Sequence, residues 1–145
     1  MNTRILTSIA LALGLTATGA HAGFHVMQIE QIIGGVNGDN TAQAIQLRMR
    51  QSSQTVVSAS SLWAADAAGA NRVLVLNIAG NVSNGATGDR VLITSAAFNN
   101  MMILGGNAGF AGDFTLTTAI PASYLSAGKL TFEQDGGTVA TPGTV

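Results

Sequence analysis

Apolar and polar side chains alternate along much of this chain. The plainest case runs from Gln43 to Arg50, where Ile45, Leu47 and Met49 are apolar and the residues between them are polar. A period of two predicts a β-strand with one face in a core and the other in water. The same pattern, less regular in places, predicts further strands over residues 24–33, 55–65, 89–94, 114–120 and 129–133.

One predicted strand differs from the others because both of its faces are apolar. Residues 72–78 fit a central strand covered on both sides, or a strand at the contact of two sheets. Residues 99–112 are compatible with a short helix followed by a glycine loop, and we interpret them as a loop-bearing excursion. Glycine, asparagine, aspartate and serine indicate turns at residues 34–40, 66–71, 81–88 and 126–128.

The even spacing of these short strands predicts an all-β fold, a single antiparallel β-sandwich of the immunoglobulin-like class. Its last hairpin is incomplete. Asp135 and Gly136 are a two-residue turn signal, but Pro142 interrupts the return strand after a few residues. Either the last strand is short, or the chain is truncated at its C-terminus. The second case would leave an unpaired edge to which another chain could add.

The first 22 residues have the pattern of a cleavable signal peptide. Residues 1–4 carry one positive charge, residues 5–15 are short and mostly apolar, and residues 16–22 end in an Ala-x-Ala pattern. The apolar run is shorter than the roughly 20 residues that span a bilayer. We therefore predict a signal peptide over 1–22, cleavage after Ala22, and a β-sandwich domain over 23–145 with no transmembrane segment. The alternative is a retained N-terminal anchor helix.

Composition narrows the classes of partner. Removal of Arg4 leaves five of the six basic residues against seven acidic ones, so no basic patch for nucleic acid or anionic lipid is expected. The chain has no cysteine, which excludes disulfides, thiolate metal sites and a cysteine nucleophile. Only 9% of the residues are charged, which weakens repulsion between copies and favours self-association. Expected partners are the chain itself or other exported proteins.

Few residues suggest catalysis. His25 is the only histidine after cleavage; it could act as the base of a Ser-His-Asp set, but no Gly-x-Ser-x-Gly motif accompanies it, and a surface or edge-strand position explains it better. Glu133 and Asp135 could form a pair of catalytic carboxylates or two solvated charges at a hairpin end. Residues 105–109 are glycine-rich like a phosphate-binding loop, but no Lys-Ser/Thr pair follows them, which argues against a nucleotide site. We therefore predict no catalytic residues and no enzyme activity.

Two groups of residues are candidates for ligand binding. Asn37, Asp39 and Asn40 in a glycine-rich loop could offer oxygen atoms to calcium, with Asp66 or Asp89 nearby, but ordinary Asx turns have the same composition. Trp63 is either the indole of the core or an exposed platform on which a sugar stacks. No other cofactor is predicted.

Three segments carry a resemblance to a known family: Ile45-Gln46-Leu47, residues 57–66 and residues 88–93. In their order and content they resemble the lamin-tail type of immunoglobulin-like sandwich found in many exported bacterial proteins. The chain departs from that pattern where Gln46 replaces a glutamate, Ser61 replaces a glycine and Trp63 is displaced by one position. The resemblance implies a non-catalytic sandwich that docks partners or surfaces and has no active site.

The sequence therefore predicts an exported, non-catalytic structural or interaction module that is secreted, periplasmic or on the cell surface. It would act by surface or edge-strand association. The alternative is a small ligand-binding domain that depends on calcium or a glycan, built from Asn37, Asp39, Asn40 and Trp63.

Overall fold

The computed structural model describes residues 27–134. The predicted signal peptide, His25, the turn at Asp135 and Gly136, and the chain beyond them lie outside the described residues. In chain order, the described elements are β1 (Met27–Ile33), β2 (Ala44–Met49), β3 (Ser60–Asp66), β4 (Val73–Ile78), β5 (Arg90–Thr94), α1 (Ala96–Leu104), β6 (Phe114–Thr115), α2 (Ala122–Ala127) and β7 (Gly128–Gln134).

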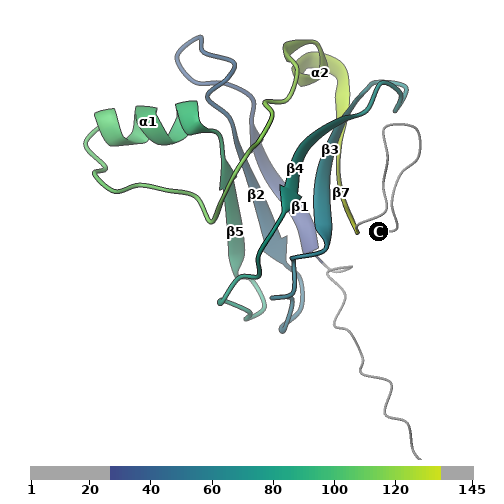
Figure 1. Ribbon diagram of the computed structural model, residues 1–145, viewed down its shortest axis with the longest axis vertical. Coiled ribbons are helices and arrows are strands. Elements are labelled where there is room, and N and C mark those ends of the chain that lie inside the picture. Colours follow the sequence, from purple (N-terminus) through teal and green to yellow (C-terminus); the bar gives the residue numbers. More distant parts are fainter. Residues whose placement is uncertain (1–26, 135–145) are drawn as a thin grey trace, which may run out of the picture.

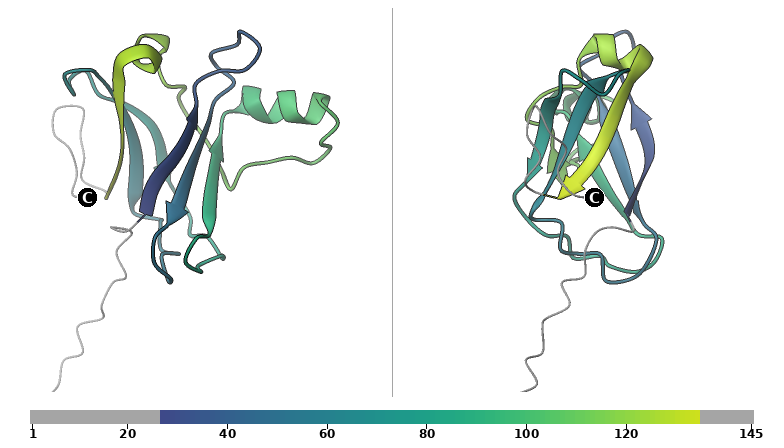
Figure 2. Two further views of the ribbon diagram at one scale, coloured as in Figure 1. Left: turned by 180° about the vertical axis from the view of Figure 1, so that it is seen from behind. Right: turned by 90° about the vertical axis from the view of Figure 1, so that its right-hand side faces the viewer.

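These strands form a sandwich of two sheets, which confirms the predicted all-β sandwich (Figure 1). One sheet has the strand order β1-β2-β5-β6 and the other the order β4-β3-β7. All pairs are antiparallel except β5 with the two-residue β6. Seen from the side, the sheets lie one behind the other, and α1 extends away from the end of β5 (Figure 2).

The main core lies between the two sheets, where each strand contributes alternate side chains. Ile45, Leu47 and Met49 of β2 are fully buried, as the alternation predicts. Burying a side chain of this size stabilises the fold by about 1.5–3 kcal/mol. The other buried members of this core are Val57, Leu62, Ala64, Val75, Leu76, Ile78, Val91, Ile93, Leu116 and Ile120.

A β-bulge in β1 divides the apolar residues of that strand between two cores. Ile29 pairs with Leu47, but the next pair joins Gln31 to Gln46, so Glu30 is an extra residue. The extra residue shifts the alternation by one, so that odd-numbered side chains after the bulge lie on the opposite face of the sheet from those before it. Met27 and Ile29 therefore pack on the main core, whereas Ile33 packs on a second core around Phe98.

The interpretation of residues 99–112 as a loop-bearing excursion is wrong in its first half. Helix α1 runs from Ala96 to Leu104 because Ser95 caps its N-terminus: the hydroxyl oxygen accepts a 3.1 Å hydrogen bond from the Phe98 amide. The helix ends at Gly105 and Gly106, and Gly106 has a positive φ of 97°.

Two other predicted segments are also corrected. Residues 126–128 are not a simple turn, because α2 occupies 122–127. The predicted strand over 114–120 lasts only two residues. It then crosses from one sheet to the other: the amide of Leu116 donates to Thr94 O, and the amide of Thr117 donates to Val75 O. Neither helix in the described residues is long and apolar enough to cross a membrane.

Strands β3 and β4 also differ from the prediction. The strand expected over 55–65 begins only at Ser60, because Ala59 has a φ of 128° that interrupts extended backbone. Among the described strands, β4 pairs with β3 alone, so it is an edge strand and not a central one; its Val75, Leu76 and Ile78 lie in the core between the two sheets, as the alternative of a sheet-sheet contact predicts. The crossing segment binds this strand through its backbone, since the Thr117 and Thr118 amides both donate to Val75 O, whereas the apolar side chain of Leu74 is exposed.

Gln43 is a buried polar side chain that joins three parts of the fold. Its Nε2 atom donates to the carbonyl oxygens of Asn40 and Ile120, at 2.6 and 2.9 Å. Its Oε1 atom accepts from the Ile120 amide at 2.7 Å, and its own amide donates to Ser95 Oγ at 2.9 Å. One residue thus connects the start of β2 to the turn before it, the segment before α2 and the cap of α1.

Replacing Gln43 by leucine should destabilise the fold strongly. The Ile120 amide and carbonyl would lose their partners, and a buried group without a partner costs about 1–3 kcal/mol. We expect the Gln43→Leu variant to lose about 2–4 kcal/mol of unfolding free energy in urea titrations. The matched control is Gln51→Leu, at an exposed turn position. Equal midpoints for the two variants would contradict this role for Gln43.

Candidate binding site

The outer face of the β1-β2-β5 sheet changes from apolar to charged along its strands. Next to α1, Ile33 lies opposite Ala44. One step further along, Gln46 lies opposite Leu92, and after that Arg48 lies opposite Arg90. The strands therefore bring an apolar row, a mixed row and a cationic row to one surface.

Helix α1 covers the apolar end of this face and encloses a pocket. Phe98 is the buried residue of the helix, and its ring lies 6.0 Å from that of Phe110, centroid to centroid, at 52°. The pocket has a volume of about 200 Å³ and a mostly apolar wall. Its lining residues are Gln31, Ile33, Ala44, Gln46, Leu92, Phe98, Met102 and Phe110.

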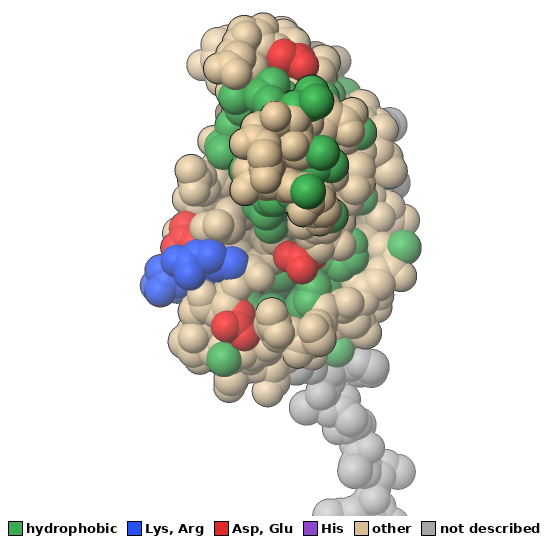
Figure 3. All heavy atoms as spheres, turned by 90° about the vertical axis from the view of Figure 1, so that its left-hand side faces the viewer, with side chains coloured by type: hydrophobic (Ala, Val, Ile, Leu, Met, Phe, Trp, Pro, Cys, Tyr) green, Lys and Arg blue, Asp and Glu red, His purple; other side chains and the backbone are tan. Residues whose placement is uncertain are grey.

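The exposed end of α1 is apolar. Leu104 is 88% exposed and Ile103 is 43% exposed. Figure 3 shows this side of the molecule: hydrophobic side chains gather on and around the protruding helix, and cationic side chains lie on the same side beside an acidic one. Contiguous exposed apolar patches, rather than single exposed residues, mark interaction sites, and Ile103 and Leu104 are adjacent at the end of α1.

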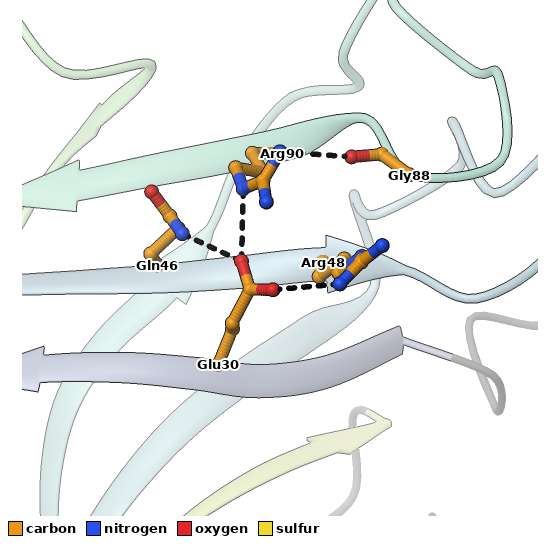
Figure 4. A network of polar contacts seen from close by, with 5 residues as sticks. All are labelled: Glu30, Gln46, Arg48, Gly88 and Arg90. Carbon is orange, nitrogen blue, oxygen red and sulfur yellow. Dashed lines mark hydrogen bonds and ion pairs between the residues drawn. The ribbon is translucent and has the colours of Figure 1, made fainter.

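At the charged end of the face, the carboxylate of the bulge residue Glu30 accepts hydrogen bonds from side chains of both β2 and β5 (Figure 4). Its Oε2 atom accepts from Arg90 Nε at 2.8 Å and from Gln46 Nε2 at 2.7 Å. Its Oε1 atom accepts from Arg48 Nη1 at 3.0 Å. Arg90 also donates to the Gly88 carbonyl at 3.3 Å. Gln46 thus belongs both to this network and to the wall of the pocket.

The arginines also set the pKa of Glu30. The hydrogen bond from Arg90, supported by those from Arg48 and Gln46, lowers the pKa of this carboxyl below its ordinary value of 4.5, against an opposing effect of desolvation. The carboxylate therefore remains ionised into mildly acidic solution, and it holds both guanidinium groups at the edge of the pocket.

The calcium candidates lie together but are used by the chain itself. Asn37 and Gly38 form the two-residue turn of a small hairpin, with φ values of 53° and 83°, and Val36 and Asp39 exchange backbone hydrogen bonds around it. Asp39 Oδ1 accepts from the Thr41 amide and hydroxyl at 2.8 and 2.6 Å, and the hydroxyl bond is the main cause that lowers the pKa of Asp39.

Asn40 completes this candidate set through its carbonyl oxygen, which accepts from Gln43. Asp66 and Asp89, proposed as additional oxygen donors, accept hydrogen bonds from Ala70 and Ala86 in their own loops. Within residues 27–134, no three acidic or histidine side chains lie close enough together to hold a metal ion. Calcium binding at this hairpin therefore stays a prediction without a gathered set of acidic ligands behind it.

Trp63 and Glu133 lie together in β3 and β7, on the outer side of the second sheet. Trp63 is 6% exposed, its Nε1 donates to Ser61 Oγ at 2.9 Å, and the guanidinium of Arg72 lies 4.6 Å from the ring centroid. Arg72 Nη2 also binds both carboxylate oxygens of Glu133, at 2.5 and 2.6 Å. A sugar could stack on the indole face that Arg72 covers only if Arg72 moved away.

A larger cavity, of about 310 Å³, opens at the side of the sandwich between the end of β1, α2 and the start of β7. Ile32, Tyr124, Leu125 and Leu130 contribute its apolar part, and Lys129 is the only charged residue in its lining. Its wall exposes more polar than apolar surface, although Ile32 in its lining is 46% exposed. The pocket under α1 is the better defined binding site.

Sequence reasoning missed this site because no chemically reactive residue marks it. Met102 lies in the segment 99–112 that is interpreted as a loop-bearing excursion, and Phe98 lies directly before it, although Ser95 three residues before Phe98 is a capping signal. The contact of Glu30 with Arg48 and Arg90 depends on the bulge, which the alternation of β1 does not reveal.

Comparisons with known proteins give no further guidance, because no family model, no curated protein and no solved structure matches this chain.

The Glu30 network should make stability depend on pH. The lowered pKa means that Glu30 stabilises the folded state above its unfolded pKa, and that this contribution is lost as the pH falls through the folded pKa. We expect the wild-type chain to have a higher urea midpoint than Glu30→Gln at pH 7, with the difference closing below pH 4.5. A difference that persists at pH 3 would show that charge is not its cause.

Proposed function

We propose that this chain is an exported, non-catalytic binding module, an immunoglobulin-like sandwich that docks a partner protein on its α1 face. One observation carries the proposal: α1 lies over an apolar pocket that is open at the surface, and the same helix ends in an almost fully exposed Leu104. The free energy falls when a partner covers apolar groups that are otherwise exposed to water.

The strand order supports the immunoglobulin-like part of the proposal. In that class, strands A, B and E form one sheet, and C and F form the other, with C′ beside C in the variable type. The order β1-β2-β5 corresponds to A-B-E, and the order β4-β3-β7 corresponds to C′-C-F. This correspondence agrees with the resemblance to lamin-tail domains, which would make the fold a scaffold for docking.

Association through the α1 face is better supported than strand addition at β1. Strand β1 pairs only with β2 among the described strands, but its bulge disturbs the edge in the middle of the strand. Bulges and charged residues such as Glu30 are the devices that prevent edge-to-edge pairing. Docking on the α1 face does not need a free strand edge.

The alternative, a ligand-binding domain that depends on calcium or a glycan, has less support. Asp39 already accepts two hydrogen bonds from Thr41, and Arg72 lies over the ring of Trp63. A rise in melting temperature on addition of calcium would favour this alternative, since a ligand that binds only the folded state stabilises it.

Export is tested by the mass of the mature protein. We expect the chain expressed in a bacterium to be recovered outside the cytoplasm with its first residue at Gly23, since Ala22 ends the Ala-x-Ala pattern. Intact mass spectrometry of the recovered protein gives the answer. A chain that keeps residues 1–22 and stays in the membrane fraction would show a retained anchor instead.

Docking is tested by site-specific photo-crosslinking in producing cells. A photoreactive phenylalanine analogue in place of Leu104 should give a discrete adduct, which mass spectrometry then identifies. The control places the analogue at Asn77, an exposed position on β4 of the other sheet. An adduct at 104 and none at 77 is the expected result. No adduct at 104, or the same products at both positions, would overturn the proposed function.

A further inference from the structure

The pocket under α1 has the size of one side chain. Its volume is about 200 Å³, and its wall is mostly apolar. Apolar protein cavities of about 150 Å³ accept a benzene ring, so an aromatic or branched aliphatic side chain fits here, whereas an extended acyl chain does not. The pocket therefore accommodates a single apolar side chain of its partner.

A pair of cationic side chains lies at a fixed spacing from this pocket. Gln46 and Leu92 line the pocket, and Arg48 and Arg90 lie two residues further along the same strands and face one another across them. Two residues along a strand span about 7 Å and return to the same face. An extended peptide lying along these strands has the same spacing between its residues i and i+2.

The two guanidinium groups keep donors for a ligand. Arg48 uses only Nη1, on Glu30, and its side chain is 39% exposed. Arg90 uses Nε and Nη1, on Glu30 and Gly88, and its side chain is 51% exposed. Within residues 27–134, their remaining N–H groups make no hydrogen bond. A nearby carboxylate, Asp113 beside Arg90, accepts the Leu92 amide through Oδ2.

We propose that this face binds an extended acidic segment of a partner protein. An apolar side chain of the segment occupies the pocket, and a carboxylate two residues along accepts hydrogen bonds from Arg48 and Arg90. Carboxylates match the planar donor fork of arginine, and Glu30 already holds both forks at the edge of the pocket. The inference rests on the proposed function and adds the chemistry of the partner to it.

The test uses blocked peptides and the isotope-labelled protein as recovered after export. The first peptide has the core Phe-Thr-Asp, the second has Phe-Thr-Asn, and the third has Ala-Thr-Asp. We expect the first to shift the amide signals of Gln31, Gln46 and Leu92, and to bind about tenfold more tightly than either of the others.

Variants separate the two parts of the proposed site. Arg90→Gln should weaken binding of the Phe-Thr-Asp peptide by about tenfold and leave the Phe-Thr-Asn peptide unchanged. Gln31→Trp, at an exposed position on the pocket wall, should close the pocket and weaken both phenylalanine peptides. The matched control is Lys129→Gln, which removes one positive charge from β7 of the other sheet and should change neither affinity.

Every other outcome overturns the inference in a distinct way. Equal affinity for the aspartate and asparagine peptides removes the role of the arginines. If none of the three peptides shifts any amide signal, this face does not bind an extended acidic segment. Light scattering that shows dimers of the wild type and monomers of Leu104→Asp makes a second copy the occupant. The crosslink from position 104 can still succeed in the first two cases, so the proposed function is judged separately.

Discussion

A single extra residue in β1 determines how this surface is built. Because Glu30 forms a bulge against β2, the odd-numbered side chains of β1 face the main core before the bulge and the outer face of the sheet after it. Met27 and Ile29 reach the core between the sheets, whereas Ile33 reaches the second core under α1. Without the bulge, Ile33 would turn inward and the pocket would lose one wall.

The same bulge links packing to charge. Its own side chain, Glu30, lies on the outer face and holds Arg48 and Arg90 beside the pocket. The other end of the pocket depends on Ser95, whose hydroxyl caps α1 and accepts the amide of Gln43. The helix is therefore tied to β2 at its N-terminus, while its last turn extends away from the sheet with Leu104 exposed.

The sequence predicted the sandwich well where a strand has one buried face. The alternation of Ile45, Leu47 and Met49 located β2 within a residue at each end. It failed at α1, whose run of alanine and methionine has no clear helical face, so that only the cap at Ser95 marked its start. The crossing after Phe114 alternates like a strand, yet its partners belong to two different sheets.

The functional candidates were harder to predict for a related reason. Asp39 and Trp63 attracted attention because their side chains carry chemistry, yet each is engaged by a neighbour in its own part of the fold. The most direct test of the account measures side-chain contacts by nuclear Overhauser effects in the labelled protein. The account predicts contacts from the Ile33 methyl groups to the Phe98 ring. Contacts from Ile33 to Leu47 in the main core instead would contradict it.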